Sequence, residues 1–194
     1  MTNQISPSRL VIDVHGLRDF TEHESDIFML EIVPLLERVA NSTQFREKVL
    51  WYNYVYTAYS GSWYWRKKLT KVSTGFKNNN GDSNKEIYDK FMSGIDEFNT
   101  ANDKDLDLFL TLYYSPRNTV GYTYPSTFKT WVNSRFFKVW LKSKAGHCKI
   151  VGNVIHEYMH NMGYNHASRN NPTRKHTVPY AFGRIATEVA RMEL

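Results

Sequence analysis

Residues 149 to 166 read KIVGNVIHEYMHNMGYNH, and this stretch decides more about the fold than any other part of the chain. Apolar residues recur in it at the spacing i, i+3, i+4, i+7, i+8 and i+11, which is typical of a helix with one face in a core. The residues on this face are Val151, Val154, Ile155, Tyr158, Met159 and Met162. The sequence therefore predicts a core-packed helix from about Lys149 to Met162.

The opposite face of this predicted helix carries the candidate site. His156 and His160 are four residues apart, so they lie about 40° apart around the helix axis, and Glu157 lies on the same side. Two imidazoles at this spacing can converge on one zinc ion. Gly163 is suited to end the helix in a left-handed conformation, which lets His166 approach as a third ligand. Three histidines leave one zinc position for water, and Glu157 is placed to act as its general base.

The string HEYMHNMGYNH at residues 156–166 fits the pattern HExxHxxGxxH and resembles the zinc-binding signature of the metzincin metallopeptidases. The resemblance extends from about Leu69 to the C-terminus. It implies one catalytic Zn²⁺ bound by the three histidines, in a shallow cleft between an upper and a lower subdomain. It also implies that an extended peptide substrate pairs with an edge strand above the metal. Thr119 to Tyr124 (TVGYTY) is the candidate for this strand.

The sequence departs from the metzincin pattern after the third histidine, where the family carries a methionine in a tight turn beneath the metal. Residues 176–180 read HTVPY, and the only later methionine is Met192. Either the turn is built around Val178 or Pro179, or Met192 serves from an unusual position. Tyr180 is a candidate catalytic residue that would stabilise the oxyanion or approach the metal. A purely structural role for Tyr180, packed beneath the site, is an equal alternative.

Two further alternatives concern the third ligand and the role of the metal. In the gluzincin class a glutamate on a later helix completes the site, and Glu188 lies at a suitable distance along the chain, but the spacing of Gly163 and His166 favours His166. The chain would otherwise be a non-catalytic, zinc-containing binding module for an acidic or protein partner. A structural zinc normally has four protein ligands, so an open position beside Glu157 favours a zinc-dependent endopeptidase that acts on peptide or protein substrates.

Strands and helices are mixed along the rest of the chain, which predicts an α+β fold. Strands are predicted at Leu10 to Val14, within Val49 to Trp65, at Asp105 to Tyr114, at Val120 to Tyr124 and at Thr130 to Phe137. Helices are predicted from a cap at Ser25 or Asp26 onward, at Asn84 to Phe98 after a cap at Ser83, and near Ala181 to Met192. We expect Pro34 to end or kink the first of these helices.

The length of 194 residues suits a single domain. The resemblance implies a mixed β-sheet with two helices above the active-site helix, followed by an irregular C-terminal subdomain that ends in a helix. On this interpretation residues 1–68 form an N-terminal extension with a strand, a helix and an aromatic stretch. Residues 69–163 form the upper subdomain with the active-site helix, and residues 164–194 form the lower one.

Composition and charge exclude several classes of protein. Hydrophobic residues make up 41% of the chain, which is typical of a folded protein, and the formal net charge is +6. The positive residues are scattered and form no long basic run, so nucleic-acid binding is not predicted. No apolar run has the length of a membrane span, and the N-terminus lacks the pattern of a secretory signal. With a lone Cys148, we expect a soluble protein that is cytoplasmic by default.

Overall fold

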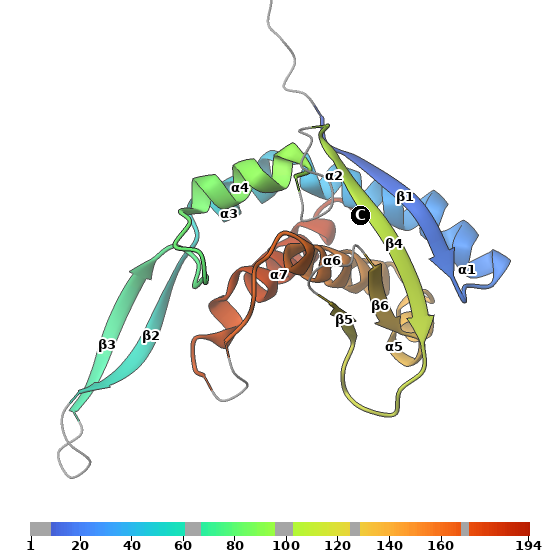
Figure 1. Cartoon of the computed structure of the whole chain (residues 1–194). Coiled ribbons are helices and arrows are strands. Elements are labelled where there is room, and N and C mark those ends of the chain that lie inside the picture. The colour runs from blue at the N-terminus through green and yellow to red at the C-terminus, as the bar shows by residue number, and fades with distance from the viewer. Residues whose placement is uncertain (1–8, 61–66, 96–102, 125–128, 168–170) are drawn as a thin grey trace, which may run out of the picture.

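The computed structural model describes residues 9–60, 67–95, 103–124, 129–167 and 171–194. It contains a four-stranded sheet made of β1 (Val11–Arg18), β4 (Asp105–Tyr113), β6 (Lys129–Asn133) and β5 (Gly121–Thr123), in the order β1-β4-β6-β5 (Figure 1). The strands β1, β4 and β6 are parallel, whereas β5 runs antiparallel to β6 at the edge. The sheet is therefore mixed, and the predicted α+β class is confirmed.

The first helical stretch begins earlier than the sequence prediction. Helix α1 (Glu22–Ile27) is capped by Thr21, whose side chain accepts a hydrogen bond from the backbone N–H of Glu24, while the Glu24 carboxylate accepts one from the N–H of Thr21. This reciprocal capping box satisfies two backbone donors, which a cap at Ser25 or Asp26 would not. A π-helical segment (Phe28–Ile32) leads into α2 (Val33–Ala40). Pro34 lies in the first turn of α2, so the irregularity falls just before it, as predicted.

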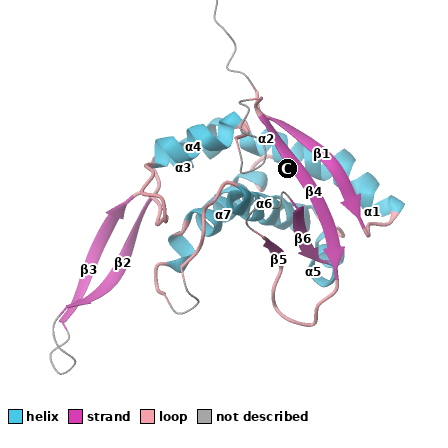
Figure 2. Ribbon diagram, viewed as in Figure 1, coloured by secondary structure: helices cyan, strands magenta, loops and turns pink. Residues whose placement is uncertain are grey.

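The described part of the aromatic stretch holds the end of a helix and one strand, while residues 61–66 lie outside the described residues. Helix α3 (Thr43–Leu50), capped by Ser42, occupies the start of the stretch and was not predicted. Strands β2 (Asn53–Ser60) and β3 (Lys67–Thr74) then pair antiparallel. Figure 2 shows this hairpin and the four-stranded sheet at opposite ends of the molecule, with α4, α6 and α7 between them. The boundary expected after residue 68 falls inside β3, and β1 belongs to the main sheet.

Two other boundaries differ from prediction for local reasons. Helix α4 (Asn84–Ser93) starts after Ser83 as expected but ends at Gly94, which has a left-handed φ of 72°, rather than at Phe98, which lies outside the described residues. The expected strand Thr130 to Phe137 is strand only to Asn133, where α5 (Ser134–Trp140) begins. The Asn133 side chain accepts a hydrogen bond from the N–H of Arg135 and so caps this helix.

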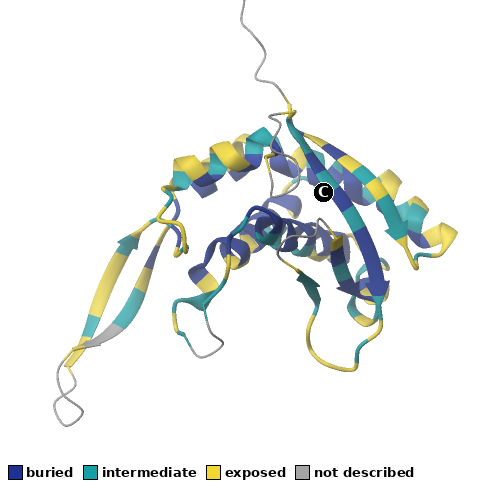
Figure 3. Ribbon diagram, in the orientation of Figure 1, coloured by how far each residue is buried: buried dark blue, intermediate teal, exposed yellow. Residues whose placement is uncertain are grey.

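The long helix α6 (Lys144–Asn161) packs against α7 (Val178–Ala190), and Figure 3 shows that both are largely buried. A cap at Ser143 starts α6 five residues before its predicted start. The two helices approach most closely at Gly152 and Gly183. A Cβ at Gly183 would lie 2.6 Å from the carbonyl oxygen of Gly152 and 3.0 Å from Cβ of His156, and one at Gly152 would collide with Thr187. Neither position therefore accepts a side chain without moving the helices apart.

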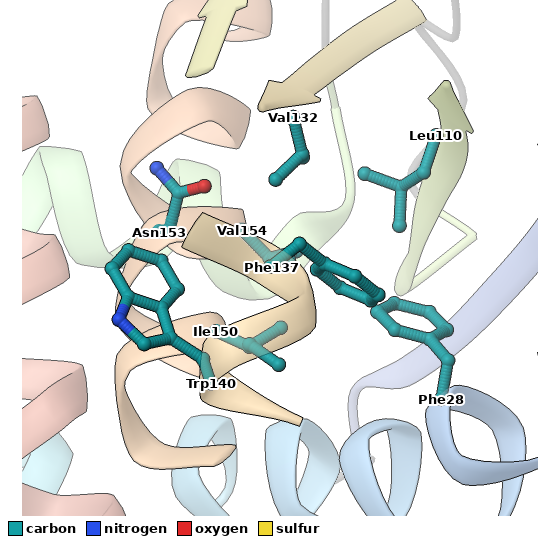
Figure 4. Close-up of a pocket in the computed structure, with 8 residues that line it drawn as sticks. All are labelled: Phe28, Leu110, Val132, Phe137, Trp140, Ile150, Asn153 and Val154. Atoms are coloured by element: carbon teal, nitrogen blue, oxygen red, sulfur yellow. The ribbon is translucent and has the colours of Figure 1, made fainter. Parts of the chain in front are cut away.

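The core between α6 and the sheet is closely packed. Figure 4 shows Phe28, Leu110, Val132, Phe137, Trp140, Ile150, Asn153 and Val154 around a space that has no room for a water-sized ligand. The apolar face of α6 predicted from the sequence is buried throughout, at Val151, Val154, Ile155, Tyr158, Met159 and Met162, and Ile150, which lies outside that face, is buried as well. Among the described residues, none of the helices has the length and apolar character needed to cross a bilayer.

Candidate metal centre

His156, His160 and His166 converge at one point, as their spacing predicts. One ring nitrogen from each lies within 4.8 Å of the others. The ring centroids are 5.3 Å apart for His156 and His160, 4.9 Å for His160 and His166, and 5.8 Å for His156 and His166. Gly163 has the left-handed φ, 83°, that ends α6 and returns the chain toward the histidines. The three half-buried imidazoles are suited to hold one metal ion.

Backbone carbonyls orient two of the three rings. The Nδ1 atom of His160 lies 2.7 Å from the carbonyl oxygen of Tyr164, and the ring of His156 hydrogen-bonds to the carbonyl of Pro179. A ring that donates from one nitrogen to a carbonyl presents the lone pair of its other nitrogen. This is the arrangement that fixes metal-binding histidines in other proteins. Val178 and Pro179, around which the sequence places the turn that lacks methionine, lie at the start of α7. The carbonyl of Pro179 contacts the ring of His156.

The surroundings keep these histidines neutral. Burial lowers the pKa of His156 to about 3, with further lowering from the nearby His160 and His166. Burial and the neighbouring His160 likewise lower the pKa of His166 to about 4, and burial lowers the pKa of His160. A neutral imidazole is the form that binds a metal, so no proton has to leave at neutral pH.

Glu157 is buried, with 4% of its surface exposed, and it faces the edge strand β5. The hydroxyl of Thr123 donates to its Oε2 at 3.3 Å, and Asn153 also hydrogen-bonds to it. A Cβ on Gly121 would lie 2.9 Å from Oε1 of Glu157. Burial raises the pKa of this carboxyl to about 8, and a bound cation would favour the ionised form.

Tyr180 lies against the histidines, with its ring centroid 4.7 Å from that of His156 and 5.1 Å from that of His166. Its hydroxyl accepts hydrogen bonds from Nε of Arg174 at 3.2 Å and from a terminal nitrogen of Arg174 at 3.0 Å. The Arg174 guanidinium also lies 5.1 Å from the centre of the Tyr180 ring. The tyrosine is 36% exposed, so it lies at the protein surface beside the histidines.

The alternative residues lie elsewhere. Glu188 pairs with Lys48 at 3.2 Å and does not belong to the histidine group. Met192 follows the end of α7 and is 63% exposed, so it does not underlie the histidines. Thr119 to Tyr124, the candidate segment for pairing with a substrate, does contain the edge strand β5, which contacts α6.

Three contributors to the site were missed by sequence reasoning. Arg174 carries no motif, and its contact with Tyr180 appears only in the folded chain. Asn153 stands four residues before Glu157 on the predicted helix, and this i, i+4 spacing was the signal that could have found it. Gly121 lay inside the candidate substrate-pairing segment, and a glycine within a strand is a signal of close approach by another group.

A second group of potential ligands lies on the main sheet. Asp13 and His15 of β1 and Asp107 of β4 bring one ligand atom each within 4.8 Å of one another. Asp13 and His15 are exposed, and Nε2 of His15 lies 2.5 Å from Oδ1 of Asp107. The hydrogen bond to Asp107 raises the pKa of His15.

The chain matches no protein-family model, no curated protein and no solved structure.

Proposed function

We propose that this chain is a zinc-dependent endopeptidase of the metzincin type, with His156, His160 and His166 as ligands and Glu157 as the general base. The observation that supports this most is the union of three neutral, half-buried imidazoles with a buried carboxylate on the neighbouring residue of the same helix. A purely structural site would have little use for that carboxylate.

Each residue has a distinct part in the proposed reaction. Zinc, when bound, would supply a Lewis acid that makes a water molecule nucleophilic near neutral pH. Glu157 would accept the proton of that water and deliver it to the amine that leaves the peptide. The outer edge of the edge strand β5 would pair with the backbone of an extended substrate and hold it beside Glu157. Tyr180 would donate its hydroxyl hydrogen bond to the developing oxyanion.

The experiment that tests this function is a comparison of Glu157→Gln with Glu188→Gln. Both replace a carboxylate by an amide of the same size, and Glu188 lies on α7 outside the histidine group. Zinc content and cleavage of a mixed peptide library are measured for the two variants and the wild type. We expect Glu157→Gln to retain zinc and to lose about 100-fold or more of its turnover, since a general base contributes on the order of 10²–10⁴.

Glu188→Gln should match the wild type in both measurements. Loss of zinc from Glu188→Gln would instead favour Glu188, in place of His166, as the third zinc ligand. A wild type that binds one zinc and cleaves no peptide would favour the non-catalytic binding module. Unchanged cleavage by Glu157→Gln would remove the proposed mechanism.

A further inference from the structure

A pocket of about 300 Å³ adjoins the histidine cluster and has no role in the proposed reaction so far. It is lined by Asn171, Pro172, Arg174, Lys175 and Tyr180. Tyr180 is the shared wall, because its ring packs on His156 and His166 while it also lines the pocket. A substrate group that flanks the scissile bond would therefore reach this pocket.

The pocket is positively charged. Arg174 and Lys175 both line it, and its described lining contains no carboxylate. Within the described ranges of the chain, neither residue takes part in an ion pair. Two adjacent cations beside a partly desolvated cluster of neutral histidines favour the entry of an anion.

Arg174 is held in place and still has donors to spare. Its side chain donates one N–H to the carbonyl oxygen of Ala167 and two to the hydroxyl of Tyr180. A guanidinium has five N–H groups, so two are left after the contacts with described residues. An arginine fixed by such contacts loses little side-chain entropy when it binds a carboxylate.

We infer that this pocket binds a carboxylate of the substrate next to the scissile bond, so that the enzyme prefers acidic peptides. The inference rests on the proposed peptidase function. The carboxylate would come from an aspartate or glutamate side chain, or from the C-terminus of a short peptide. Arg174 would form the hydrogen-bonded ion pair, Lys175 would add charge, and Asn171 would contribute a polar edge.

The test uses matched peptides that differ in one group. In the first comparison, each peptide with Asp or Glu at a position around the cleaved bond is matched by a peptide with Asn or Gln there. In the second comparison, a peptide with a free C-terminus is matched by the same peptide with a C-terminal amide. We expect the zinc-loaded wild type to cleave the acidic member with a kcat/KM at least about tenfold higher, the size of effect that one charge-assisted hydrogen bond gives. Selectivity in the first comparison identifies a side-chain carboxylate, and selectivity in the second identifies the C-terminus.

Variants assign the selectivity to the pocket. Arg174→Gln should bring the ratio of kcat/KM values close to one, and Arg174→Glu should favour peptides with Lys or Arg at that position. Because Arg174 also holds Tyr180, Lys175→Gln is the second variant, and it should lower the ratio about threefold. Arg38→Gln is the matched control: it removes the same charge from an exposed position on α2 that does not line the pocket, and it should keep the wild-type ratio.

The outcomes separate the pocket from the proposed function. Cleavage with a ratio near one in the wild type, or an unchanged ratio in Arg174→Gln and Lys175→Gln, overturns the inference while the peptidase stands. If no peptide is cleaved, binding of fluorescent versions of the same pairs to the zinc-loaded protein decides. Tighter binding of the acidic member that depends on Arg174 supports the pocket although the peptidase fails, and equal binding overturns both.

Discussion

The two groups of histidine and carboxylate side chains contain similar atoms in very different surroundings. His156, His160 and His166 lie at the end of a buried helix, with Glu157 beneath the edge strand. Asp13, His15 and Asp107 lie on the outer part of the sheet, where the side chains of Asp13 and His15 are 56% and 46% exposed. Each group brings three ligand atoms together, so proximity alone does not distinguish them.

Protonation distinguishes them. Burial lowers the pKa values of the three clustered histidines, which leaves their nitrogen lone pairs free for a metal. The hydrogen bond to Asp107 raises the pKa of His15, so a metal would first have to displace a stabilised proton. The histidine cluster is therefore the better candidate for a metal, because burial removes protons from its rings and backbone carbonyls orient two of them.

The largest expected effect is on zinc affinity. His160→Ala removes a proposed ligand, whose Nδ1 lies 2.7 Å from the carbonyl oxygen of Tyr164, and we expect the Kd for zinc to rise by more than about 100-fold. Loss of a residue that merely orients a ligand already costs on the order of 10–100-fold. The matched change in the surface group, His15→Ala, should leave the Kd unchanged. Competition with a chromogenic chelator measures both values, and equal losses would erase the distinction between the two groups.

An intermediate effect is expected from Gly121→Ala. The added Cβ would lie 2.9 Å from Oε1 of Glu157 and 3.0 Å from the carbonyl oxygen of Trp131, so the carboxylate or the edge strand must shift. We expect turnover to fall about tenfold, since small displacements of a catalytic group are costly, while zinc affinity stays within twofold. Gly81→Ala is the matched control, because it is the same substitution at a position where an added Cβ meets no atom within 4 Å. Its positive φ costs some stability, but we expect its turnover to match that of the wild type. Full activity in Gly121→Ala would indicate that Glu157 acts from another position.

The smallest effect is on the stability of the folded protein and concerns Asp105, which lies near Asp13 and Asp107. Burial and the adjacent Asp103, Asp107 and Asp13 raise the pKa of Asp105 from 3.8 to about 6. The folded state therefore holds the proton more tightly than the unfolded chain, and stability is lost as the pH rises from about 4 to 6. Asp105→Asn removes this loss, so its melting temperature should exceed that of the wild type by on the order of 3 °C at pH 7.5.

Thermal unfolding at several pH values checks this prediction. The difference between Asp105→Asn and the wild type should shrink toward zero at about pH 3 and below, where the carboxyl is mostly protonated in both states. A difference that is constant with pH would mean that the repulsion among these carboxylates does not limit stability.

The sequence predicted the helix and the convergence of its histidines because both depend on local periodicity. Val151, Val154 and Ile155 define the buried face, and His156 and His160 follow from the same spacing. Caps were harder to assign. Thr21 competes with Ser25 and Asp26, and Asn133 caps a helix inside a segment predicted as strand, so the choice depends on which backbone N–H groups are left unpaired in the folded chain.

The pocket beside Tyr180 could not be predicted from the sequence at all. Arg174 lies eight residues beyond His166 in a stretch with no helical or strand periodicity, so the sequence does not indicate that its side chain turns toward Ala167 and Tyr180. The parallel pairing of β1 with β4 is likewise a contact between distant segments that no local pattern encodes.

The close approach of α6 and α7 at Gly152 and Gly183 has a consequence for tracing this architecture in other sequences. These positions admit no side chain, and Gly183 also borders Cβ of His156, so the two glycines set the depth at which that imidazole is seated. A sequence that adopts the same helix packing is expected to keep glycine at both positions, because a Cβ at either one would push the two helices apart. The glycine pair is thus required by the packing of the two helices and does not depend on the proposed chemistry.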